Sequence, residues 1–132
     1  MRRSVTTFLL ASVLALPVVD TAAAATKTKV VIRKFSGTTY QVDHFGQLQV
    51  VITVKKTTKG KKVTRRITAV SVPVYPSSSG RSMYISENAI PILRSEALRA
   101  QSANIDLVSG ATDTSDAFAG SLQAAIIKAK KA

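Results

Sequence analysis

Several residue types are missing or scarce in this chain of 132 residues, and each absence excludes a class of site. There is no cysteine, which rules out disulfides, thiolate metal ligands and a lipid-bearing cysteine. His44 is the only histidine and the 7 acidic residues are scattered, so we expect no metal site and place His44 in a turn or at the surface. Stability must therefore come from packing or from a bound ligand.

Residues 1–25 have the pattern of a secretory signal. Arg2 and Arg3 precede an apolar run from Val5 to Val19, and the small residues of T-A-A-A-A follow. We predict export by the general route, a single mature domain of residues 26–132, and a location outside the cytoplasmic membrane in association with the cell envelope. A retained membrane anchor is the alternative, although the run is short for a membrane span.

The first half of the mature chain predicts strands. Lys29–Phe35 is rich in β-branched residues, and a turn at Ser36–Gly37 leads to a short extended piece at Thr38–Val42. Gln47–Lys56 and Val63–Val74 form a hairpin that turns near Gly60. The first of these two strands alternates, with four apolar residues on one face: Leu48, Val50, Ile52 and Val54.

The second half predicts two helices. We expect Pro76–Ser82 to be a flexible loop and Tyr84 and Ile85 to be extended. A helix should then begin at a Ser86 or Asn88 cap, with Pro91 in its first turn, and end near Ser102. A second helix is indicated to about Lys130 by apolar residues at helical spacing: Phe118, Leu122, Ala125, Ile126 and Ala129. The element order predicts an α+β fold, an antiparallel sheet of about three to five strands with two main helices packed on one side.

The two helical segments are joined by D-L-V-S-G-A-T-D-T-S, from Asp106 to Ser115. Gly110 permits a tight turn, and the hydroxyl and carboxylate side chains are of the types that cap helix starts. A helix N-terminus presents free N–H groups and partial positive charge, which favour an anion such as a phosphate. From composition alone, simple capping and anion binding both remain open.

The run D-x-x-S-G-A-T-x-T-S resembles the flavinylation motif of the FMN-binding domain family; it is formed by Asp106, Ser109, Gly110, Ala111, Thr112, Thr114 and Ser115. That family includes flavin-carrying subunits of the sodium-pumping NADH:quinone oxidoreductase and of the Rnf complex, and many small extracytoplasmic electron carriers. The resemblance extends to F-S-G-T-T-Y, to Phe45–Gly46 and to the lead-in A-I-P-I-L-R-S-E-A-L-R-A-Q-S-A-N-I-D, and so covers nearly all of the chain after about Ala25. The family fold agrees with the α+β expectation.

The resemblance implies an electron carrier that is not itself an enzyme. FMN would be esterified through its phosphate to Thr112 by a separate, magnesium-dependent flavin transferase that uses FAD. The residues implied in cofactor binding are Thr112, Ser109, Gly110, Ala111, Thr114 and Ser115, and those implied in recognition by the transferase are Asp106 and Ser109–Thr112. A threonine hydroxyl is a poor nucleophile without a base or a metal, so the transferase must activate it. For Asp106, capping of a turn is an equal alternative.

This chain departs from the family pattern at two places. Asp113 is acidic where a neutral or apolar residue is expected, and its carboxylate would repel the ester phosphate. The acidic E-T-P-G-like loop of many family members is absent from the Pro76–Ser82 region, so no binding residue is carried over from there.

A basic cluster occupies the hairpin turn. Seven of the twelve residues from Lys55 to Arg66 are basic, namely Lys55, Lys56, Lys59, Lys61, Lys62, Arg65 and Arg66, and the chain from residue 26 carries 17 basic and 6 acidic side chains, 17 − 6 = +11. Such charge attracts anionic partners, but no aromatic residue is interleaved with it, so we do not expect nucleic acid. A solvated turn and contact with an anionic envelope or an acidic redox partner both remain open. The alternative function is a basic envelope-binding module that holds FMN loosely or not at all.

Overall fold

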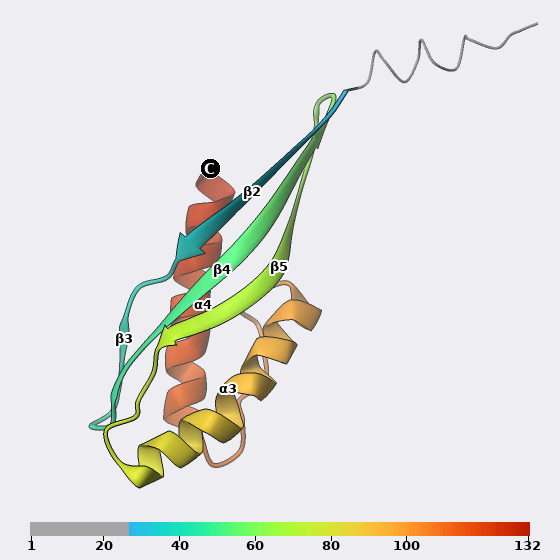
Figure 1. Cartoon of the computed structure of the whole chain (residues 1–132). Helices are drawn as coiled ribbons and strands as arrows, with labels where there is room; N and C mark the ends of the chain where they lie inside the picture. The colour runs from blue at the N-terminus through green and yellow to red at the C-terminus, as the bar shows by residue number, and fades with distance from the viewer. Residues whose placement is uncertain (1–26) are drawn as a thin grey trace, which may run out of the picture. The chain divides into compact units, whose positions relative to one another are not determined.

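The computed structural model describes residues 27–132 as an α+β fold, as predicted (Figure 1). The predicted signal segment lies outside the described residues. The elements, in chain order, are β2 (Thr28–Ser36), β3 (Tyr40–Val42), β4 (Gly46–Lys59), β5 (Lys62–Val74), α3 (Gly80–Ala100) and α4 (Thr112–Lys131). The described residues form two compact parts, residues 27–30 with Thr57–Thr64, and Val31–Lys56 with Arg65–Ala132. The core and the sites discussed below all lie in the second part.

The sheet is built around β4, which pairs with the other three strands. Tyr40 of β3 lies opposite Leu48, and the N–H of Gly37 donates to the carbonyl of Val50 at 2.7 Å. The segment that follows β2 and the strand β3 therefore run along one edge of β4, and β5 takes the other edge. The predicted hairpin turn is confirmed, because Gly60 adopts a left-handed φ of 64° between β4 and β5.

The core lies on one face of the sheet, as the alternation in β4 predicted. All four predicted inward residues are buried, with Leu48, Val50 and Ile52 completely inaccessible. They pack in one cluster with residues from both helices, which identifies the face that the helices cover; the helical members are Ala89, Leu93, Ala97, Ala117, Phe118, Leu122, Ala125 and Ala129.

Helix α4 approaches the sheet very closely at one point, where only small residues fit. A Cβ on Gly37 would collide with the backbone carbonyl of Ser121, and a Cβ on Gly120 would come within 3.0 Å of the Tyr40 ring. The hydroxyl of Ser121, which is fully buried, accepts a hydrogen bond from the N–H of Val50 at 2.8 Å. This hydrogen bond ties α4 directly to the central strand.

The start of α3 differs from the sequence prediction. The helix begins at Gly80, so Tyr84 and Ile85 are helical rather than extended, and the loop that starts at Pro76 ends at Ser79. A capping box explains the early start, since the Ser79 side chain accepts from the N–H of Ser82 and the Ser82 hydroxyl is bonded to the N–H of Ser79.

Pro91 also lies elsewhere than predicted, in the middle of α3 rather than in its first turn. Both Pro91 and Glu87, four residues earlier, are exposed. The carbonyl of Glu87, which loses its helical partner to the proline ring, can therefore be hydrated.

The free edge of β5 is covered by side chains from α3 and its C-cap. Arg94 Nε donates to the carbonyl of Val70 at 2.9 Å. Gln101 Oε1 accepts from the N–H of Ile67 at 2.8 Å, and its Nε2 donates to the carbonyl of the same residue at 3.0 Å. These contacts satisfy backbone groups that would otherwise present an open strand edge.

Candidate functional site

The loop before α4 is fastened to the first turn of that helix by Ser115. Its buried hydroxyl accepts from the N–H of Val108 at 2.9 Å and donates to the carbonyl of Ala111 at 2.7 Å. The N–H of Ala111 in turn donates to the carbonyl of Val108 at 2.9 Å, and Gly110 supplies the positive φ of 82° that the turn requires. Ser115, one of the residues implied in cofactor binding, thus has its hydroxyl engaged in holding the loop.

No side chain caps the start of α4. The N-cap residue is Ala111, which has no side-chain oxygen, and no side-chain hydrogen bond caps this end of the helix. The alternative that the hydroxyls of this stretch serve as the helix N-cap is therefore wrong. The backbone N–H groups of Thr112, Asp113 and Thr114 are the first three of the helix, where no intrahelical acceptor exists, so the end keeps its affinity for an anion.

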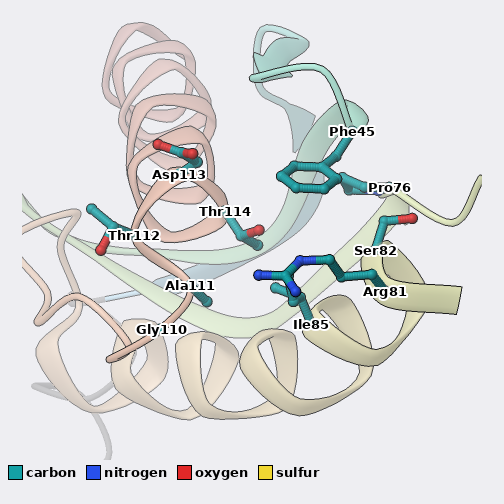
Figure 2. A pocket seen from close by; sticks show the side chains of 10 residues that line it. All are labelled: Phe45, Pro76, Arg81, Ser82, Ile85, Gly110, Ala111, Thr112, Asp113 and Thr114. Carbon is teal, nitrogen blue, oxygen red and sulfur yellow. The ribbon is translucent and has the colours of Figure 1, made fainter. Parts of the chain in front are cut away.

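A hollow of about 160 Å³ opens beside this helix start (Figure 2). One wall is Gly110–Thr114, and the opposite wall comes from the first turns of α3, with Arg81, Ser82 and Ile85. Phe45, from the turn before β4, and Pro76, after β5, close the third side. Three segments far apart in the sequence therefore meet at the motif.

The positive side-chain charge in the hollow comes from Arg81, and Asp113 is the one acidic residue that lines it. Figure 2 shows its side chain extending toward the start of α4 between Phe45 and Ile85, and among residues 27–132 no carboxylate forms an ion pair with it. Asp113 is the nearest acidic residue in sequence to Thr112, and Figure 2 shows its carboxylate directed away from Arg81. A guanidinium and an uncapped helix N-terminus thus act on the same hollow, and both favour an anionic group.

The two threonines of the motif differ in exposure. Thr112 is exposed, and in Figure 2 its side chain points to the outer side of the helix start, away from Arg81. Thr114 is only 4% exposed, and its side chain lies on the same side of the helix start as the Arg81 guanidinium. Of the two hydroxyls, that of Thr112 is the one a second protein can reach.

The predicted site residues are brought together only in part. Gly110, Ala111, Thr112 and Thr114 line the hollow, whereas Ser109 is exposed beside it and is not part of its wall.

Asp106 is exposed, and its side chain has no hydrogen-bond partner within the described part of the chain, so turn capping is not observed and recognition by a transferase stays a prediction. Its charge adds weakly to that of Glu96, whose hydrogen bond and negative charge raise the pKa of Arg99 near the end of α3.

Arg81 is the main residue that sequence reasoning missed. The sequence places it in a flexible loop, because the predicted helix begins after it. Had the serine pair at positions 79 and 82 been recognised as a capping box, Arg81 and Ile85 would have fallen four residues apart on one helical face.

The remaining features add no second chemistry at this place. Within residues 27–132, no three histidine, cysteine or acidic residues gather at a common point. His44 is exposed in a turn, with Nδ1 2.8 Å from the Asp43 carboxylate and its ring tilted by 32° against that of Phe45. Of the helices in the described region, none combines the length and the apolar character that crossing a membrane requires.

No protein-family model matches this chain, and no curated protein does. What the site can bind is therefore judged from its own residues. They are an exposed threonine hydroxyl, an uncapped helix N-terminus, one guanidinium and one half-buried phenylalanine ring around a small hollow.

Proposed function

We propose that the protein is an exported flavoprotein that carries FMN as a phosphoester on Thr112 and transfers electrons outside the cytoplasmic membrane. One observation carries the proposal. The threonine of D-x-x-S-G-A-T is exposed at an uncapped helix start, beside a hollow that holds a guanidinium and an aromatic ring. Such an end favours phosphate, and the motif resembles the one on which FMN is esterified.

The residues of the hollow fit the parts of FMN. The N–H groups of Thr112, Asp113 and Thr114 and the Arg81 guanidinium are the donors available to phosphate oxygens or to an anionic reduced flavin. Phe45 offers a flat apolar surface for an aromatic ring. FMN would supply the redox chemistry, and these residues would set its position and exposure.

The size of the hollow favours a carrier over an enzyme with its own substrate. Pockets that enclose a whole ligand of this kind measure about 300–1,000 Å³. At about 160 Å³ the hollow encloses only part of FMN, so much of the flavin stays open to other proteins. An exposed flavin suits exchange of electrons with partners.

Attachment requires a second protein, the flavin transferase. In the balanced step, the Thr112 oxygen forms a bond to the FMN phosphorus of FAD, and the bond from that phosphorus to the bridging oxygen of the pyrophosphate breaks. AMP leaves with the bridging oxygen, and the hydroxyl proton passes to a base of the transferase. No base of this chain is required, which agrees with the exposed position of Thr112.

The test is to produce the protein together with an active flavin transferase and to measure its mass. We expect a gain of one FMN minus one water, and a yellow colour that persists after denaturation. Thr112→Val should abolish both, while Thr114→Val should keep the covalent mass, because the buried Thr114 hydroxyl is not the acceptor. A colourless protein at its unmodified mass would refute covalent carriage. Loss of attachment in Thr114→Val but not in Thr112→Val would show that the ester is on Thr114 rather than on Thr112.

The alternative function, a basic envelope-binding module with loose or no FMN, is favoured by one observation. The cations of the Lys55–Arg66 cluster form no ion pair with a carboxylate of the described residues, as expected of a surface that contacts an anionic partner. The mass measurement separates the two functions, because the module would bind anionic surfaces at its unmodified mass.

A further inference from the structure

A second hollow, of about 220 Å³, lies at the opposite end of α4. Ile52 and Val54 of β4 and Ile67 of β5 form its floor, and Ile126 and Ala129 of α4 form its wall. The floor is part of the buried core face, and the half-buried Ile126 is the most accessible apolar residue of the hollow.

The hollow lies between the C-cap of α3 and the last turns of α4. Helix α3 ends at Ala100, and the next residue, Gln101, takes a left-handed φ of 54° and is fixed to Ile67 by two hydrogen bonds. Ala103 and Ile105 of the following loop pack against the core. The hollow is left between Gln101 and the last turns of α4.

All charged residues that line this hollow are basic, and we call it the basic hollow. Arg65, Arg66 and Lys130 line it, and no carboxylate of the described chain forms an ion pair with them. No acidic residue occurs between His44 and Ser86 or after Asp116, so the sequence places none on the neighbouring strands or on the last three turns of α4. Lys56 and Arg65 both donate to the backbone oxygen of Ala132 at 3.1 Å, which shows that cations from two strands can converge on one oxygen acceptor.

We infer that the basic hollow anchors an acidic partner protein through one apolar side chain flanked by carboxylates. Its size decides between occupants. Enclosed ligand sites measure about 300–1,000 Å³. The basic hollow is smaller and open, so it holds a single large side chain rather than an acyl chain or a cofactor. Apolar anchors in desolvated pockets, surrounded by charged rims, are the usual centres of protein interfaces.

The anchor is separate from the flavin site and does not depend on it. The first hollow lies at the start of α4 and the basic hollow near its end, and 20 helical residues span about 30 Å. A partner held at the basic hollow leaves the start of α4 uncovered. The anchor therefore retains the carrier on its partner while the other end remains free to meet an electron donor or acceptor.

The probe is a fluorescent pentapeptide with one phenylalanine between two pairs of glutamates, and its matched control has alanine in place of phenylalanine. Binding to the purified, flavin-free protein is measured by anisotropy at low and high salt. We expect the phenylalanine peptide to bind roughly tenfold more tightly than the alanine peptide. Ile126→Ala, which removes part of the apolar wall, should lose most of that preference, with folding checked by circular dichroism.

A charge-matched pair of variants tests the rim. Lys130→Gln should weaken binding of both peptides roughly two- to fivefold at low salt. Lys34→Gln removes the same charge from β2. The neighbouring Phe35 side chain packs on the core, so Lys34 points to the other face of the sheet. This control should change binding less than about twofold.

Four outcomes overturn the inference. Equal binding of the two peptides, or equal weakening by Lys130→Gln and Lys34→Gln, means that the cations act only through net charge. Failure of both peptides to bind leaves no anchor for an acidic segment. Binding to phosphatidylglycerol vesicles that depends on Ile126 and Lys130, without preference between the peptides, assigns the surface to a membrane instead.

Discussion

Ser115→Ala is the substitution that tests most directly how the candidate site is held in shape. It removes the oxygen that accepts from the N–H of Val108 and donates to the carbonyl of Ala111. The carbonyl of Ala111 keeps a partner, because the backbone N–H of Ser115 also donates to it at 2.9 Å. The main loss is therefore the acceptor of the half-buried Val108 N–H.

The magnitude follows from that loss. A buried donor left without an acceptor costs about 1–3 kcal/mol, and Val108 is partly rather than fully buried, so we expect the free energy of unfolding to fall by about 1–2 kcal/mol. For a domain of about this size, each kcal/mol lowers the melting temperature by roughly 4–8 °C. The loop should loosen in the native state as well, since its link to the helix is gone.

Two measurements check the prediction. Urea unfolding gives the change in free energy, with Ser95→Ala, at an exposed position of α3, as the control expected within about 0.5 kcal/mol of the parent. Hydrogen exchange gives the local effect, since the Val108 amide should lose protection while amides in the core of β4 follow only the global change. Parental stability together with unchanged exchange at Val108 would refute the claim that Ser115 fastens the loop.

The remaining predictions concern the helix approach, the strand edge and the charge beside the acceptor. Gly37→Ala should lower the free energy of unfolding by about 3 kcal/mol or more in a urea titration, because the new Cβ meets the Ser121 backbone. The control Gly80→Ala, where nothing lies within 4 Å of the new Cβ, should be neutral or stabilising. Equal effects of the two substitutions would contradict the close approach of α4. Gln101→Ala should lower the free energy of unfolding by about 2 kcal/mol, because the hydrogen bonds to Ile67 are lost. Gln101→Gly should lower it by about 1 kcal/mol less than the alanine variant does, because glycine tolerates the left-handed φ at this position. A larger loss for glycine would show that the left-handed φ does not strain the alanine variant. Asp113→Asn should lower the free energy of unfolding by about 0.3–1 kcal/mol, because the Asp113 carboxylate stabilises the helix start. The same substitution should speed flavinylation by a co-produced transferase, because the carboxylate repels the incoming phosphate. Slower attachment would show that Asp113 assists the transferase instead.

The strands could be predicted because their pattern is local. Leu48, Val50, Ile52 and Val54 alternate without interruption, and the strand they predict is buried on that face. Glycine at position 60 marked the hairpin turn for a similarly local reason, since it takes the conformation that other residues avoid.

The start of α3 could not be predicted from the same kind of signal. Its capping box has serine at the third helical position in place of the usual glutamate or glutamine, so it resembles the serine-rich loop that precedes it. Pro91 then suggested a later start, because proline is common in a first turn. The wrong boundary moved Arg81 out of the helix and hence out of the candidate site.

The motif itself was visible in the sequence, but the sequence did not show which of its hydroxyls is buried under the loop and which lines the hollow. Ser115 and Thr114 are both of types that bind phosphates, and only the observed start of α4 at Thr112 shows that one is fully buried under the loop while the other lines the hollow. Which hydroxyl faces solvent depends on the phase of the helix. A shift of one residue at the helix start rotates every side chain by about 100°, and a propensity argument does not fix the boundary so closely.

The proposed anion site at the start of α4 combines an acidic first turn with a cation from another helix. Asp113 in the first turn and Lys128, Lys130 and Lys131 in the last turn all complement the helix dipole, so both ends favour folding. At the start this arrangement opposes phosphate binding, because Asp113 offsets part of the positive potential of the free N–H groups. Arg81 restores that potential from a different helix, with its guanidinium in the hollow and the Asp113 carboxylate directed away. On the proposed function, the stability of α4 and its affinity for the cofactor phosphate are thus set by different residues, and Arg81, outside the motif, is the one whose loss should weaken the anion site without weakening the helix.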